Sequence, residues 1–196
     1  MADRSSSQNR IVGNTVWTLL LLTAIVSGCA HHVDPAQQLS SAVSPFTLAR
    51  NQSVELVATA KHSVGASDLN TLAVAYGSLQ EKGNAYAGFL IEAITDTSFD
   101  ADKNAKCASN LAQAIKAFNK AFASVSAPNQ KDASVQSAWL PTFSDSVGSY
   151  WKRYDTATPT LSPETKADLV KQLKAETVWP NYEDIATETI TAPSPH

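Results

Sequence analysis

Two long stretches of the chain carry apolar or small residues at alternating spacings of three and four positions. The first series is Leu69, Leu72, Tyr76, Leu79, Gly83, Tyr86, Leu90 and Ala93, and the second is Ala108, Leu111, Ile115, Phe118, Phe122 and Val125. This spacing places each series on one face of an α-helix, and such a face needs burial. Because the connection at residues 97–102 is short, the sequence predicts an antiparallel helical hairpin with the two faces against each other.

The first of these helices contains three glycines. We predict that Asp68 caps its N-terminus. Gly77, Gly83 and Gly88 follow in its interior, where each weakens a helix by up to about 1 kcal/mol relative to alanine. We expect the close approach of a neighbouring helix to compensate for them.

Three further helical segments complete the predicted domain. Ser44 and Pro45 match an N-cap and a first helical position, so a helix is predicted from there to about His62. A segment over about 131–154 carries apolar and aromatic residues, and Pro141 is expected to kink it or split it in two. The apolar and aromatic members of this segment are Val135, Trp139, Phe143, Val147, Trp151 and Tyr154.

A last helix is predicted after Ser162, with Pro163 at its first position and Pro180 as its stop. Its expected apolar face is made by Leu169, Val170, Leu173 and Val178. The pattern as a whole predicts an all-α fold, an antiparallel bundle of four to five helices over residues 44–186. A flexible tail over 187–196 is expected after it.

The N-terminal region has the layout of an export signal. Arg4 and Arg10 precede an apolar run of 11 residues from Val16 to Val26. A helix that spans a bilayer needs about 20 apolar residues, so this run fits a cleaved signal better than a permanent span. The run ends in Val26-Ser27-Gly28-Cys29, which resembles the lipobox of bacterial lipoproteins.

This resemblance covers residues 1–29 and implies a specific processing. The signal at 1–28 would be removed, and Cys29 would carry a diacylglycerol on its sulfur and a further acyl chain on its amino group. Residues 29–43 would then be the lipidated cysteine and a polar tether. Ala30 follows Cys29, and by the same resemblance a residue other than Asp there favours the outer membrane, facing the periplasm. The acyl chains would make the membrane a partner, since two or more chains anchor a protein stably.

Charge and cysteine content argue against a nucleic-acid partner and against an internal disulfide. Without residues 1–28 the chain keeps 13 basic and 17 acidic residues, a net charge of −4, and has no basic run. We therefore expect no nucleic-acid partner. Cys107 is the one thiol left once Cys29 is lipidated, so no internal disulfide is predicted. Cys107 is either a small half-buried side chain or the site of a disulfide between two chains.

The sequence offers no catalytic or metal-binding constellation. Asp100-Ala101-Asp102-Lys103-Asn104 matches the opening of a calcium loop, but the required Gly and Glu at positions six and twelve are Ala105 and Leu111. These acids are better explained as the first turn of a helix. The four histidines show no ligand spacing, and a pair such as Glu92 and Asp96 is expected on a solvated face. We expect no catalytic residue, no metal and no cofactor.

The tryptophans of the mature chain lie late in the sequence, with other aromatic and basic residues. We considered two interpretations: a possible interaction surface, or aromatic packing in the core. The residues of that possible surface are Trp139, Trp151, Arg153, Tyr154 and Trp179.

These observations predict a membrane-anchored envelope lipoprotein with a non-enzymatic interaction or structural role, with an envelope protein as its partner. Two alternatives remain open at this point. One is a periplasmic immunity or inhibitor protein, and the other is a helical bundle that binds a small ligand or a glycan.

Overall fold

A computed structural model describes residues 35–60, 66–96, 98–130, 132–157 and 161–185. In these ranges the chain is all-α and forms a helical bundle, which confirms the predicted fold class. Its helices are α1 (Pro35–Ala60), α2 (Ala66–Asp96), α3 (Ala101–Val125), the 3₁₀ turn η1 (Pro128–Gln130), α4 (Trp139–Ala157) and α5 (Pro163–Glu176). None of the described helices is long and apolar enough to cross a membrane. The predicted signal, Cys29 and the tail lie outside these residues.

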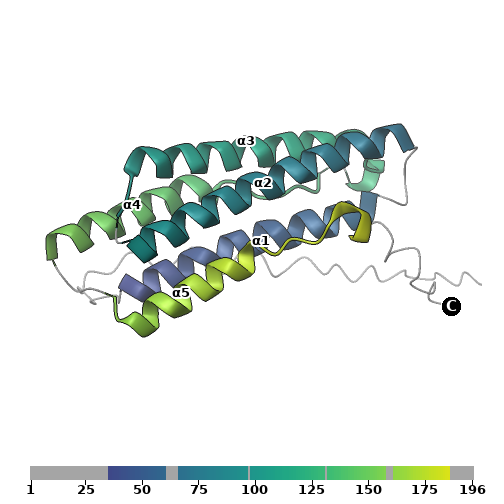
Figure 1. Cartoon of the computed structure of the whole chain (residues 1–196). Coiled ribbons are helices and arrows are strands. Elements are labelled where there is room, and N and C mark those ends of the chain that lie inside the picture. Colours follow the sequence, from purple (N-terminus) through teal and green to yellow (C-terminus); the bar gives the residue numbers. More distant parts are fainter. Residues whose placement is uncertain (1–34, 61–65, 97, 131, 158–160, 186–196) are drawn as a thin grey trace, which may run out of the picture. The chain divides into compact units, whose positions relative to one another are not determined.

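Successive helices of the bundle run in opposite directions (Figure 1). The most extensive packing is between α2 and α3, which form the predicted antiparallel hairpin, and α5 packs on α1 and α2 while α4 packs on α1 and α3. Leu79 of α2 and Ile115 of α3 are each 0% exposed and belong to one core cluster. The two apolar series therefore face a shared core, as their spacing predicts.

The ends of the hairpin helices follow local capping chemistry. Asp100 is the N-cap of α3, and its carboxylate accepts a hydrogen bond of 2.9 Å from the backbone N–H of Lys103. This confirms the interpretation of the acidic run as a helix start. The predicted cap of α2 is wrong, because α2 begins at Ala66 and Asp68 is its third residue.

Helix α1 begins at Pro35, earlier than predicted, and continues through Ser44 and Pro45. Part of the segment predicted as a tether is thus helical. Proline is tolerated at the first position of a helix, where its missing N–H has no partner to lose. A proline inside a helix removes a backbone hydrogen bond and crowds the carbonyl four residues before it. Helix α1 nevertheless continues through Pro45 to Phe46 and Ala49, which are buried in the core.

Helix α4 is neither kinked nor split at its proline. Pro141 is the third residue of α4, and the N–H groups of the first turn need no intrahelical acceptor. The helix begins later than predicted, because residues 132–138 are not helical and Asn119 of α3 holds them. The Asn119 side chain donates to the Val135 carbonyl at 2.9 Å and accepts from the Val135 N–H at 2.8 Å.

Helix α5 starts as predicted and ends early. The hydroxyl of Ser162 accepts a hydrogen bond from the Thr165 N–H at 3.2 Å, and Pro163 follows it as the first helical residue. The helix ends at Glu176, before Pro180. Val178 therefore lies beyond the helix and is 72% exposed, so its assignment to the apolar face is wrong.

A set of polar contacts joins the end of α5 to α1. The Thr47 hydroxyl donates to Glu176 Oε1 at 2.7 Å, and Arg50 Nη1 lies 3.5 Å from Glu176 Oε2. Arg50 also donates to the Ala175 carbonyl at 2.9 Å. The Trp179 indole N–H donates to the Glu176 carbonyl at 2.8 Å, which holds its ring against α2.

Only one of the three glycines of α2 meets a close neighbour. A Cβ on Gly83 would lie 2.9 Å from Cζ2 of Trp179, whereas a Cβ on Gly77 or Gly88 would have nothing within 4 Å. The expectation of close helix approach at all three is therefore wrong. The neighbour at Gly83 is an indole ring and not a helix backbone.

Candidate functional site

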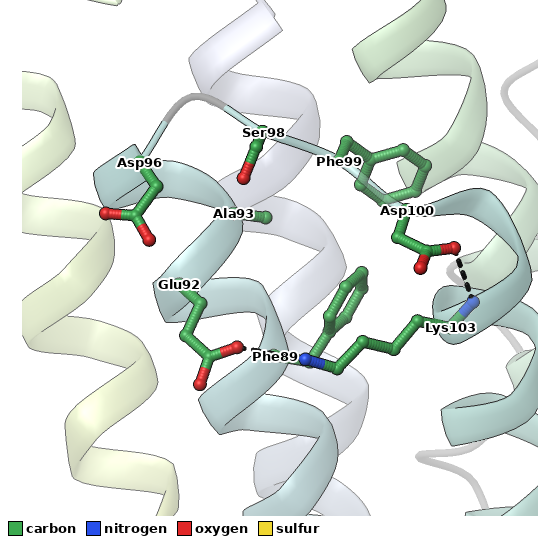
Figure 2. A pocket seen from close by; sticks show the side chains of 8 residues that line it. All are labelled: Phe89, Glu92, Ala93, Asp96, Ser98, Phe99, Asp100 and Lys103. Carbon is green, nitrogen blue, oxygen red and sulfur yellow. Dashed lines mark hydrogen bonds and ion pairs between the residues drawn. The ribbon is translucent and has the colours of Figure 1, made fainter.

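The surface of the described residues has a hollow at the end of the bundle where α2 connects to α3 (Figure 2). The hollow encloses about 280 Å³ and is open to one side. Its lining residues are Phe89, Glu92, Ala93, Asp96, Ser98, Phe99, Asp100 and Lys103. Ligand pockets cover most of the surface of their ligand. Because this hollow is open to one side, it suits contact with a surface better than enclosure of a small molecule.

Lys103, the basic residue of the hollow, contacts the Glu92 carboxylate and the Phe89 ring. Lys103 Nζ lies 3.0 Å from Glu92 Oε2 and 5.3 Å from the centre of the Phe89 ring. The hydrogen bond to Glu92, and then the charge of that carboxylate, raise the pKa of Lys103. The two side chains are 51% and 65% exposed, so water screens the pair.

Two aromatic lining residues, Phe89 and Phe99, form the floor beneath these charges, and Trp151 packs against Phe99. The Phe89 and Phe99 ring centres are 5.8 Å apart, and Phe99 stacks on Trp151 of α4 at 5.6 Å with an angle of 13° between the planes. Phe89 and Trp151 are both 5% exposed, and Phe99 is half-buried. The floor is therefore part of the core, with Phe99 at its exposed edge.

A buried polar network lies further along the same helices. The Tyr86 hydroxyl donates to Asn104 Oδ1 at 2.8 Å, and Asn104 Nδ2 donates to the carbonyl and the hydroxyl of Ser144 at 3.0 and 2.9 Å. Burial raises the pKa of Tyr86 well above its usual range, so the hydroxyl stays protonated and acts as a donor. This network joins α2, α3 and α4.

The free thiol is close to the network but is not activated. Cys107 is half-buried, as one of its two interpretations predicted. Burial raises the pKa of its thiol, although Lys103 and Lys106 partly oppose this. A nucleophilic cysteine needs a lowered pKa. In the described part of the chain, no group of three or more His, Cys, Asp or Glu side chains is arranged to hold a metal ion.

Of the late tryptophans, Trp151 is buried in the core, and Trp139 and Trp179 are partly buried and pack against it. Trp139 lies 5.5 Å from Phe46 between ring centres, Trp151 is buried against Phe99, and Trp179 lies 6.0 Å from Tyr76. These contacts show that the three rings pack against the core, and the part of Trp139 and Trp179 in an interaction surface stays a prediction. The side chains of Arg153 and Tyr154 lie outside the described residues, so their part in an interaction surface stays a prediction.

Sequence reasoning missed three buried polar residues of the described chain, although the spacing carries a signal for each. Ser53 follows the buried Ala49 of α1 by four positions, and it is 0% exposed. Asn104 precedes Ala108 by four positions, which extends the apolar series of α3, and it is 3% exposed. Glu176 follows Leu173 by three positions on the buried face of α5, and it is 9% exposed. A polar residue at such a position indicates a buried hydrogen bond.

Comparisons of this chain with protein-family models, with curated proteins and with solved structures found no match.

Proposed function

We propose that this protein is a lipid-anchored component of the bacterial cell envelope that acts by binding another envelope protein and not by catalysis. The observation that carries the proposal is Val26-Ser27-Gly28-Cys29 directly after a short apolar run, because lipid attachment requires a thiol at that position. By the residue that follows Cys29, the proposed location is the outer membrane, with the domain in the periplasm.

The interior of the bundle supports a non-enzymatic role. Its buried polar groups link helices to each other: Tyr86, Asn104 and Ser144 join three helices, and Thr47 and Arg50 hold Glu176 of α5. The hollow beside α2 and α3 is open to one side, and its lysine is paired with Glu92. An anchored bundle of this kind presents an outer surface for contact.

Glycan binding by the late aromatics has less support. A glycan platform needs an exposed ring face and free polar groups beside it. Trp151 is 5% exposed. The indole N–H groups of Trp139 and Trp179 already donate to the Gln136 and Glu176 carbonyls, each at 2.8 Å.

The lipid anchor is tested by mass spectrometry of the protein from membrane fractions. Cys29→Ser is expected to abolish the mass of the acyl chains and to leave the precursor uncut or mislocalised, because the acyl acceptor is gone. Cys107→Ser is the matched control and should leave processing unchanged. A mature chain that begins at another residue and carries no lipid would contradict the proposal.

The binding role is tested by purification from solubilised outer membranes. We expect a defined envelope protein to co-purify in constant proportion with the lipidated chain, and its recovery to fall in the Cys29→Ser variant. If instead the purified protein turned over a substrate, the non-enzymatic assignment would be wrong.

A further inference from the structure

We infer that the end of the bundle with the α2–α3 connection faces the membrane and lies at the zwitterionic headgroups of the bilayer that holds the anchor. This inference rests on the proposed lipidation of Cys29. It follows from the register of the helices, the length of chain before α1 and the chemistry of that end.

The register of α1 against α2 identifies the end that lies near the anchor. The rings of Phe46 and Tyr86 are 5.4 Å apart between centres, and α1 and α2 run in opposite directions (Figure 1). Pro35, the first residue of α1, precedes Phe46 by 11 positions. The position 11 residues after Tyr86 falls in the α2–α3 connection. The start of α1 and that connection are therefore level along the bundle.

Two other helices reach the same end. Thr47 contacts Glu176 at 2.7 Å, and α5 runs in the same direction as α1 (Figure 1), so the start of α5 lies near the start of α1. Trp151 in the last part of α4 stacks on Phe99 of the α2–α3 connection. This end thus gathers the start of α1, the turn of the hairpin, the start of α5 and the end of α4.

The chain before α1 is too short to place this end far from the lipid. Six Cα–Cα steps separate Cys29 from Pro35, and at roughly 3.3–3.6 Å each they reach about 22 Å at most. Helix α2 has 31 residues and is about 46 Å long. An anchor at Cys29 therefore keeps the α1 start near the bilayer, while the opposite end can extend well into the periplasm.

The chemistry of this end suits a hydrated headgroup layer. Glu92, Asp96 and Asp100 line the hollow together with one lysine, and Figure 2 shows them among the side chains that surround it. The ammonium groups of zwitterionic lipids complement these carboxylates, whereas anionic headgroups repel them. The half-buried ring of Phe99 at the edge of the floor is apolar, and Phe is among the side chains that membrane-surface segments bury at the boundary of the headgroups.

The experiment compares two labelled positions on the full-length lipidated protein in vesicles of phosphatidylethanolamine and phosphatidylcholine. A Cys107→Ala background carries either Ser98→Cys, at the hollow, or Ser124→Cys, near the end of α3. Both serines are exposed, and the helix between them separates the two positions by roughly 35 Å. Each thiol carries a fluorophore, and the vesicles contain a lipid with a nitroxide on its headgroup.

We expect quenching at Ser98→Cys to exceed that at Ser124→Cys by at least about threefold, given the reach of the chain. Equal or stronger quenching at Ser124→Cys, on protein that carries the acyl mass and floats with the vesicles, would overturn the orientation and leave the anchor intact. Protein that carries no acyl mass would overturn the proposed function, and the inference with it.

Two changes to the experiment test separately the role of the headgroup charge and the role of the short chain before α1. Replacing part of the zwitterionic lipid by phosphatidylglycerol should lower the quenching at Ser98→Cys, and an increase would contradict the headgroup assignment. A flexible 20-residue Gly/Ser insertion after His32 adds roughly 25 Å of mean reach. It should reduce the ratio between the two positions, and an unchanged ratio would show that the short chain does not set the orientation.

Discussion

Gly83 lies on the buried face of α2, directly beneath the ring of Trp179. Gly83→Ala would bring a methyl group to 2.9 Å from Cζ2 of that ring. Moving the ring strains its hydrogen bond to the Glu176 carbonyl, and overpacking of this kind costs about 1–3 kcal/mol. We expect a lower free energy of unfolding in urea, despite the better helix propensity of alanine.

Gly77 is the matched control for that substitution. It lies in the same helix and is exposed, and a Cβ there meets nothing within 4 Å. Gly77→Ala should raise the free energy of unfolding by up to about 1 kcal/mol, because only the helix propensity changes. If the two variants changed stability alike, the contact between Trp179 and Gly83 would not matter in solution.

The buried hydrogen bond between Tyr86 and Asn104 is a second feature whose contribution to stability can be tested by single substitutions. Asn104→Ala removes the acceptor of the Tyr86 hydroxyl and two donors to Ser144, so it should lower the free energy of unfolding by about 2–3 kcal/mol. Tyr86→Phe should cost about 1 kcal/mol. In urea denaturation the double variant should cost less than the sum, and strict additivity would show that the two side chains do not interact.

At the scale of the elements, the hairpin of α2 and α3 supports the rest of the bundle. Leu79 is 0% exposed at its centre. Leu79→Asp would bury a charge without a partner, which costs several kcal/mol, against a typical domain stability of about 5–15 kcal/mol. We expect the domain to unfold, as measured by circular dichroism and a thermal melt on a chain without residues 1–29.

The control for Leu79→Asp is Thr95→Asp in the same helix. Thr95 is exposed, and its hydroxyl donates only within α2, to the Ile91 carbonyl at 2.8 Å. Its replacement should leave the melting temperature nearly unchanged. A Leu79→Asp variant that melted like the unsubstituted chain would show that this face of α2 is not part of the core.

The elements also show what the sequence can predict. The apolar series on α2 and α3 correctly predicted the hairpin, because a long buried face repeats the same spacing many times. The ends of helices were less predictable. Pro45 resembles a helix start as much as Pro35 does, and the choice depends on how far the packed helix can extend. Val178 was assigned to α5 because apolar character alone does not show where a helix stops.

At the scale of the whole molecule, the candidate site was harder to predict than the fold. The hollow depends on which ends of helices meet, and Phe99 and Trp151 are 52 positions apart in the sequence. Local spacing holds no information about such a contact. Trp139, Trp151 and Trp179 each contact an aromatic side chain from another part of the bundle, and the interaction surface predicted from the sequence stays a prediction.

The reactivity of the half-buried Cys107 thiol determines whether two chains can be joined by a disulfide. Burial raises the pKa of this thiol, so the reactive thiolate forms only at a higher pH than for an ordinary cysteine. We expect the chain without residues 1–29 to stay monomeric on a non-reducing gel after exposure to air, and Cys107→Ala to cost about 1 kcal/mol. The rate of alkylation by iodoacetamide should rise at a more alkaline pH than that of an exposed thiol, for which Ser98→Cys in the Cys107→Ala background is the reference. A dimer band that disappears with Cys107→Ala would show instead that the thiol is accessible and links two chains.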